Sequence, residues 1–285
     1  MPFYIARGLS DDHLLAPDAV AIPMRLRREE ASPSAGPLIP GLEHTAADPV
    51  ANLSTAARAY LAALGFPDPD GSEVAADVIW YHALAIGYSP TYLTENEDGV
   101  RQDWPRIPMP AAESLLTASA ALGRQVAALL DTEKPVPGVT SGRVRGEFKS
   151  VGLFERVDGK PARPEVGDLD VTAGWGHAGR RGVTMPGKGK LVQRDDGGLD
   201  VFLNDVSCWR NVPQEGWDFT IGGYQVIKKW LSYREKPLLG RSLTPDEVRH
   251  VTEMIRRLAA LVALRPELDG NYRTVTENLF AWPEG

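Results

Sequence analysis

The segment at residues 174–190, GWGHAGRRGVTMPGKGK, combines six glycines with four cationic side chains and one histidine. Glycine lets the backbone approach a ligand closely, and clustered Lys and Arg side chains supply positive charge for phosphate groups. Arginine can also donate two hydrogen bonds to the edge of a guanine base. We therefore predict a polyanion-binding loop, with a solvated hairpin connection as the alternative. The candidate ligand-binding residues are His177, Arg180, Arg181, Lys188 and Lys190. For His177 a plain loop position and a proton-transfer role also remain open.

A second basic segment, WDFTIGGYQVIKKWLSYRE, occupies residues 217–235. It starts with strand-like residues, turns at Gly222 and Gly223, and continues as a helix. The helical spacing of Tyr224, Ile227 and Leu231 predicts its apolar face. A glycine pair at the start of a helix leaves backbone N–H groups free for a phosphate or carboxylate. The candidate binding residues here are Gly222, Gly223, Lys228, Lys229 and Arg234. The alternative is a packed amphipathic helix with solvated lysines.

The sequence lacks the motifs of several common enzyme classes. The GKGK run at residues 187–190 does not have the spacing of a Walker motif, and Leu191 stands where Ser or Thr is required. GWGHAG matches G-x-G-x-x-G, but no helix-forming stretch follows it. There is no GxSxG nucleophile elbow and no HExxH. His82 has no second ligand at metal-binding spacing, so we predict a satisfied core histidine. No catalytic residue, metal ligand or cofactor is predicted.

Composition indicates a globular protein with a substantial core, since 43% of its 285 residues are hydrophobic. Cys208 is the single cysteine, which excludes an internal disulfide and fits a reducing cytoplasm, and no apolar run reaches membrane-spanning length. The net charge is −7. Residues 141–194 hold 11 Lys and Arg against 6 Asp and Glu (+5), and residues 217–257 hold 8 against 5 (+3), so the remainder carries −15. Two basic segments in an acidic protein favour a local polyanion site.

Residue patterns predict an α+β fold in four parts. Residues 1–53 are irregular and proline-rich apart from a short strand at 19–26, as in a junction from an upstream region. Residues 54–134 are helical, with Ser54 and Ser72 as caps, a long connection at 87–110 and a helix at about 111–130. Residues 135–216 are β-rich, with strands in 142–157 and 167–175 and a hairpin closing at 196–198. Residues 217–285 hold the basic helix and a final helix whose capping box begins at Thr244. The helical spacing of Val248, Val251, Ile255, Leu258 and Leu261 predicts an apolar stripe along that final helix.

Five segments, taken in order, resemble the C-terminal specificity region of Type ISP restriction–modification enzymes, which are related to type IIG restriction–methyltransferases. They are NLSTAARAYLAALG, IWYHALAIGYSPTYLTE, DWPRIPMP, the TAGWGHAG…VTMPGKGK loop and IGGYQVIKKWLSYRE, between about Asn52 and Tyr272. The resemblance implies a target-recognition module that follows an N6-adenine methyltransferase domain, with helicase and nuclease modules further upstream. It also implies double-stranded DNA and a methyltransferase or nuclease domain or subunit as partners, in a restriction–modification or phage-defence system.

The catalytic motifs of that family are missing from the sequence, which has no NPP(Y/F) motif, no S-adenosylmethionine glycine motif near its start and no Walker A. We therefore expect DNA recognition without catalysis. The loop at 174–190 is expected to enter the DNA, and the cations of 217–235 to hold its backbone. One alternative is a non-DNA assembly subunit whose basic elements bind an acidic partner protein. Another, a methyltransferase or nuclease in its own right, conflicts with the missing motifs.

Overall fold

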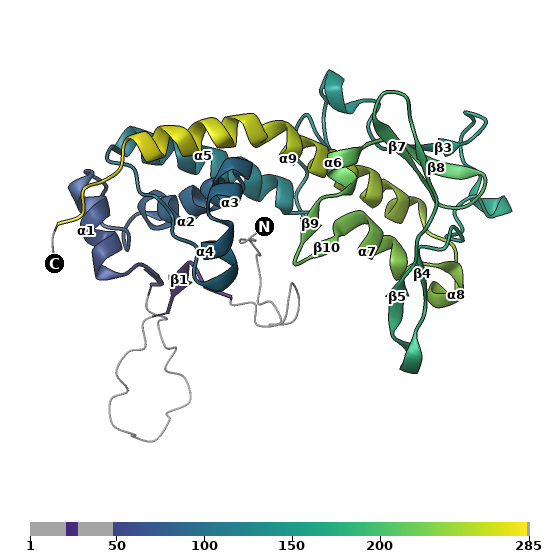
Figure 1. Ribbon diagram of the computed structural model, residues 1–285, viewed down its shortest axis with the longest axis horizontal. Helices are drawn as coiled ribbons and strands as arrows, with labels where there is room; N and C mark the ends of the chain where they lie inside the picture. Colours follow the sequence, from purple (N-terminus) through teal and green to yellow (C-terminus); the bar gives the residue numbers. More distant parts are fainter. Residues whose placement is uncertain (1–20, 28–47, 284–285) are drawn as a thin grey trace, which may run out of the picture.

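The computed structural model describes residues 21–27 and 48–283. Figure 1 shows an elongated molecule in which helices gather at one end and strands at the other. One long helix, α9 (Pro245–Glu277), runs from one end to the other. Separate helical and antiparallel β regions confirm the predicted α+β class. The division into four residue ranges stays a prediction.

The predicted junction at residues 1–53 lies mostly outside the described residues. Within it, β1 (Arg25–Leu26) pairs antiparallel with β2 (Val50–Ala51), which confirms the end of the strand predicted at 19–26. Asp70 ties this ribbon to the helical end, because one of its carboxylate oxygens accepts hydrogen bonds from the backbone N–H of Ala51 (2.9 Å) and from Arg58 (2.8 Å).

The helical end is built from five helices before α9: α1 (Thr55–Ala63), α2 (Glu73–Gly87), α3 (Pro90–Glu95), α4 (Glu97–Gln102) and α5 (Glu113–Leu130). Ser54 and Ser72 cap α1 and α2 as predicted, since each hydroxyl accepts a backbone N–H three residues on. Gly123 of α5 lies where α2 comes closest. A Cβ at this position would stand 1.8 Å from the carbonyl oxygen of Tyr81.

The connection predicted at residues 87–110 contains α3 and α4, so the prediction of one long connection is wrong. Ser89 accepts a hydrogen bond from the N–H of Tyr92 and caps α3, with Pro90 at the first helical position. Tyr92 is buried, as an aromatic anchor should be, whereas Trp104 is exposed. The Ser-Pro pair is an ordinary helix-start signal, which the many prolines of the segment obscured.

The β-rich end contains a four-stranded antiparallel sheet. Its order is β3 (Leu153–Arg156), β8 (Ser207–Pro213), β7 (Gly198–Phe202) and β6 (Leu191–Gln193). The β6–β7 hairpin confirms the predicted turn. The strands predicted in 142–157 and 167–175 are wrong apart from β3. In 167–175 the apolar side chains of Leu169, Val171 and Trp175 enter the core one by one, while the amide of Asn204 binds two backbone carbonyls of the segment.

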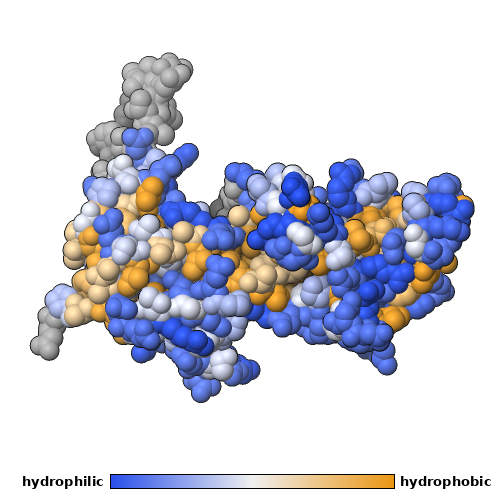
Figure 2. Space-filling view, turned by 90° about the horizontal axis from the view of Figure 1, so that it is seen from above, coloured by the Kyte–Doolittle hydropathy of each residue, from blue (hydrophilic) through white to orange (hydrophobic). Residues whose placement is uncertain are grey.

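Helix α9 joins the two ends. Thr244 and Glu247 form the predicted capping box, and the predicted apolar stripe is buried. Arg257 is buried and donates hydrogen bonds to the carbonyls of residues 128, 129 and 134, at the C-terminus of α5. Asp269 accepts hydrogen bonds from Ser89 (2.5 Å) and from the N–H of Thr91 (2.9 Å), at the N-terminus of α3. Seen from above, hydrophobic and hydrophilic side chains are interspersed along the molecule (Figure 2).

Candidate functional site

The two basic segments of the sequence lie side by side in the structure. The first forms a hairpin of β4 (Gly176–Ala178) and β5 (Thr184–Pro186), and the second contains α7 (Val226–Ser232). The hairpin projects from the body of the β-rich end beside α7 (Figure 1). Their contact is close, because a Cβ at Gly176 would stand 1.9 Å from the carbonyl oxygen of Ser232. The candidate cations therefore share one region of the surface.

The cations of the hairpin differ in what they contact. Arg180 and Arg181 form the tip and Lys188 follows β5; all three are exposed and, among the described residues, have no hydrogen-bond or ion-pair partner. His177 lies exposed on β4. Lys190 is half-buried, with its Nζ 2.9 Å from Asp205 and 4.6 Å from the ring centre of Phe202. Lys190 is thus partly engaged within the protein.

Several glycines of this hairpin allow close packing within the protein, whereas Gly174 and Gly182 have open space around them; the approach of a ligand to this backbone stays a prediction. A Cβ at Gly187 would stand 2.0 Å from the carbonyl oxygen of Gly174, and one at Gly189 would stand 2.0 Å from the buried ring of Trp175. Gly176 is closed in by Ser232, as described above. The glycines here let the chain pass between its own buried groups.

Glu235, at the end of the second basic segment, holds the base of the hairpin. Its side chain is buried, and its carboxylate accepts a hydrogen bond from the backbone N–H of Trp175. Burial raises the pKa of Glu235, and backbone N–H groups at residues 174–176 oppose that rise. An N–H of the G-x-G-x-x-G segment thus points inward to a carboxylate.

The glycine pair Gly222–Gly223 does not open a helix, so the prediction of a helix that starts at these glycines is wrong. Their role in DNA binding stays a prediction. The two residues have φ of 56° and 80° and form the turn between β9 (Thr220–Ile221) and β10 (Tyr224–Gln225). Positive φ at both central positions is what a type I′ hairpin turn needs. The helix α7 begins only at Val226. Phosphate binding by N–H groups of a glycine-started helix therefore does not apply.

The apolar face of α7 is confirmed at Ile227 and Leu231, which are buried. The prediction is wrong for Tyr224, which lies on β10 and is 54% exposed. Its ring instead contacts Lys229, whose Nζ lies 4.2 Å from the ring centre of Tyr224 and 5.0 Å from that of Tyr233. Both tyrosines are exposed, so Lys229 is held between two aromatic rings at the surface.

The remaining two cations of the segment contrast with each other. Lys228 is half-buried and has no ion-pair partner within the part of the chain that the structure describes. The guanidinium of Arg234 lies 3.7 Å from the ring centre of Trp230, and its Nε is 3.8 Å from a carboxylate oxygen of Glu247. Burial lowers the pKa of Arg234. Arg234 therefore braces α7 against α9.

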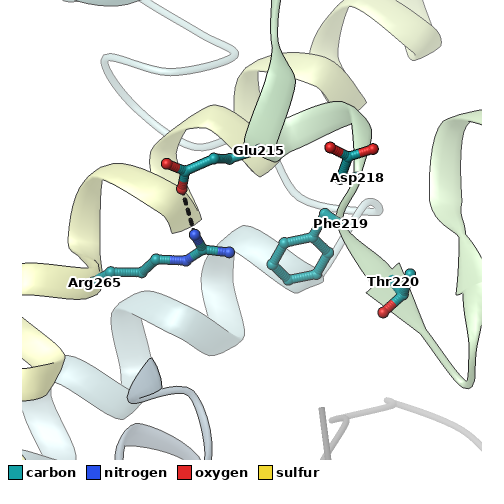
Figure 3. Close-up of a pocket in the computed structure, with 5 residues that line it drawn as sticks. All are labelled: Glu215, Asp218, Phe219, Thr220 and Arg265. Carbon is teal, nitrogen blue, oxygen red and sulfur yellow. Dashed lines mark hydrogen bonds and ion pairs between the residues drawn. The ribbon is translucent and has the colours of Figure 1, made fainter. Parts of the chain in front are cut away.

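A pocket of ≈ 270 Å³ lies where α6 (Gln214–Trp217), β9 and α9 meet. Part of its lining, residues 218–220, belongs to the second basic segment. Figure 3 shows its lining: Glu215, Asp218, Phe219, Thr220 and Arg265. Glu215 and Arg265 form an ion pair across it. The carboxylate of Asp218 accepts hydrogen bonds from Gln214 (2.6 Å) and Gln225 (3.2 Å). Both carboxylates that line the pocket, those of Glu215 and Asp218, are therefore engaged in contacts within the protein.

His82 confirms the prediction of a satisfied core histidine. Its Nδ1 lies 2.7 Å from the hydroxyl oxygen of Ser119, and its Nε2 lies 2.8 Å from the carbonyl oxygen of Pro108. Burial lowers the pKa of His82 to about 4 and raises that of the Cys208 thiol to about 11. Within residues 21–27 and 48–283 no group of three or more His, Cys, Asp and Glu side chains could hold a metal ion. No described helix is long and apolar enough to cross a membrane.

Comparison with known proteins gave two kinds of match, and none among curated proteins. The solved structures that are similar to this chain include two complexes with DNA. One is a nuclease-deletion mutant of the Type ISP restriction-modification enzyme LlaGI in complex with a DNA substrate mimic, at 15% identity and a TM-score of 0.39, covering 68% of this chain and 16% of that one. The other is a DrdV–DNA complex, at 19% identity and a TM-score of 0.44, covering 83% of this chain and 21% of that one.

The chain thus spans about a fifth or less of the length of these two proteins. The second kind of match is to a protein family. Residues 1–260 match the family described as the Type ISP C-terminal specificity domain, and this range includes both basic segments and the first part of α9. The chain therefore belongs to the Type ISP C-terminal specificity domain family.

Proposed function

We propose that this chain recognises a DNA target sequence for a Type ISP restriction–modification enzyme and catalyses no reaction by itself. One observation carries the proposal: unpartnered, exposed cations at the tip of a projecting hairpin lie beside the lysines of α7, in a protein that is otherwise acidic. Such an arrangement attracts a polyanion to one place and repels it elsewhere. The membership in a specificity-domain family agrees with it.

The cations divide the work of binding between them. Lysines and arginines that contact phosphates set the position of the protein on the duplex, and contacts to base edges select the sequence. Lys188, Lys228 and Lys229 are suited to phosphates, as compact charges near the surface. The hairpin is suited to the major groove, which admits a two-stranded ribbon. Lys190 and Arg234 already have internal partners and add less.

The proposed partners are double-stranded DNA and a methyltransferase or nuclease domain or subunit, either of which would perform the chemistry in the cytoplasm. The system would be restriction–modification or a related form of phage defence. The chain needs no cofactor for recognition in this proposal, because charge and hydrogen bonding of its own side chains provide the contacts.

Fluorescence anisotropy with duplex DNA at several salt concentrations tests the proposal. Binding should weaken steeply with salt, because each neutralised phosphate releases counterions. The double variant Arg180→Gln/Arg181→Gln should bind more weakly, with a smaller slope of log K against log salt. The double variant Lys228→Gln/Lys229→Gln should likewise bind DNA more weakly and with a smaller salt slope.

The matched control is Arg101→Gln/Arg273→Gln, which removes two exposed charges from the helical end. Its affinity should stay close to that of the wild type. Absence of binding at low salt, or binding that does not respond to salt, would contradict DNA recognition. It would favour an assembly subunit whose basic surface binds an acidic protein.

A further inference from the structure

Arg181 occupies a position of the β4–β5 hairpin turn that favours glycine or asparagine. Its φ is 62° and its ψ is 27°, in the left-handed region that costs a residue with a side chain free energy. Among the described residues one other non-glycine residue, Asn211, has a positive φ. Asn211 has two reasons for it: asparagine tolerates this region, and the residue hydrogen-bonds to Ser150 (3.2 Å) and Asp200 (3.2 Å).

Arg181 has neither reason. Its side chain is exposed and, within the described part of the chain, forms no hydrogen bond, ion pair or ring contact. The next residue, Gly182, also has a positive φ of 78°, in open space. The hairpin turn accounts for the positive φ of both residues, but glycine or asparagine would adopt it at a lower cost than arginine. No contact of the Arg181 side chain within the described residues offsets that cost. A costly backbone conformation with no internal compensation points to a contact outside the chain.

The hairpin fixes the position of Arg181 relative to the body of the protein. At the tip, the N–H of Gly179 donates to the carbonyl of Val183 (2.5 Å). At the base, Trp175 is held twice: its backbone N–H donates to Glu235, and its indole N–H donates to the carbonyl of Phe202 (2.7 Å). The backbone that carries Arg181 is therefore already ordered and loses little freedom on binding.

We propose that Arg181 is a base-reading residue, whose guanidinium donates two hydrogen bonds to O6 and N7 of a guanine in the major groove. This inference rests on the proposed function and deepens it. Arginine is the side chain suited to this bidentate contact. Val183, which is 59% exposed beside the tip, supplies an apolar surface against the same groove. Arg180, with the same charge and an ordinary backbone, contacts phosphate.

Selection of bound sequences from a randomised duplex library tests the assignment. The wild type should enrich a motif that contains at least one guanine. Arg181→Lys keeps the charge but loses the fork, so it should lose the preference at one guanine position and keep the rest of the motif. Arg180→Lys is the matched control and should leave the whole motif unchanged.

Anisotropy with the selected duplex and with the same duplex changed at that guanine gives the magnitude. The wild type should discriminate on the order of tenfold or more between the two, and Arg181→Lys should not discriminate. Affinity of Arg181→Lys for unrelated duplexes should stay within about threefold of the wild type, because phosphate contacts are unaffected.

The results separate this inference from the proposed function. If the wild type selects a motif and Arg181→Lys selects the same one, the inference is overturned and DNA recognition stands. If the wild type binds no DNA or selects no motif, both are overturned. Arg181→Gly checks for a structural role: its urea midpoint should be no lower than that of the wild type, because glycine adopts the left-handed backbone at a lower cost. A clear drop would mean that Arg181 serves the fold.

Discussion

The helical end and the projecting hairpin use polar side chains in opposite ways. At the helical end, His82, Ser119 and Asn271 form a closed chain of hydrogen bonds, and Asp269 satisfies the start of α3. At the hairpin tip, Arg180 and Arg181 have no partner among the described residues. Closed networks stabilise a fold, whereas open cations leave charge available for a ligand. The comparison separates residues that serve folding from residues that serve binding.

The hairpin itself repeats this contrast between its base and its tip. Gly189 at the base and Gly182 at the tip have similar φ, 67° and 78°, but a Cβ at Gly189 would meet the ring of Trp175 at 2.0 Å and one at Gly182 would meet nothing within 4 Å. We expect Gly189→Ala to lower the free energy of unfolding by about 4 kcal/mol, from overpacking and from the left-handed backbone together. Gly182→Ala, the control, should cost about 1 kcal/mol.

Urea denaturation of the two variants measures the difference. Equal losses would show that the base of the hairpin yields as readily as its tip, and the contrast between a packed base and an open tip would be lost.

The closed network of His82 predicts a pH dependence of stability. Burial lowers its pKa to about 4 from the ordinary 6.5. The unfolded chain therefore takes up the proton first, and stability should fall as the pH drops from 6.5 towards 4, by about 3 kcal/mol in total. His82→Gln, which cannot be protonated in this range, should remove that part of the decline.

Urea midpoints at pH 7, 5.5 and 4.5 give the comparison, with NMR titration of the imidazole as a direct readout. A pKa of His82 near 6.5, or equal declines in both proteins, would mean that the network at the helical end is open to water.

The smallest expected effects distinguish the cations of the two basic segments. Arg234 stacks on Trp230 and lies near Glu247, so Arg234→Ala should lower the free energy of unfolding by about 1 kcal/mol. Arg180→Ala should change the free energy of unfolding by less than about 0.5 kcal/mol, because the Arg180 side chain forms no hydrogen bond or ion pair with the described residues. A larger loss for Arg180→Ala, seen as a lower urea midpoint, would assign the tip a structural role.

Local signals predicted the elements that they control. The side chains that cap α1, α2 and α9 act within one turn of the chain, and all three caps are confirmed. Alternation of apolar residues at 142–157 and 167–175 predicted strands, of which only β3 is confirmed. An irregular segment can bury its apolar side chains singly, as Leu169 and Val171 show, and periodicity cannot distinguish the two cases.

The candidate site was predictable as a charge pattern but not as a geometry. The sequence by itself determined the starts of α1, α2 and α9, the buried stripe of α9 and the two concentrations of positive charge, because each depends on near neighbours along the chain. Only the tertiary structure decided which cations stay available, since Asp205 and Glu247 come from other elements to engage Lys190 and Arg234. It also closed in Gly176 and Gly189, because the carbonyl of Ser232 and the ring of Trp175 pack against them. Pairing and close packing depend on distances in space, which spacing along the chain does not contain.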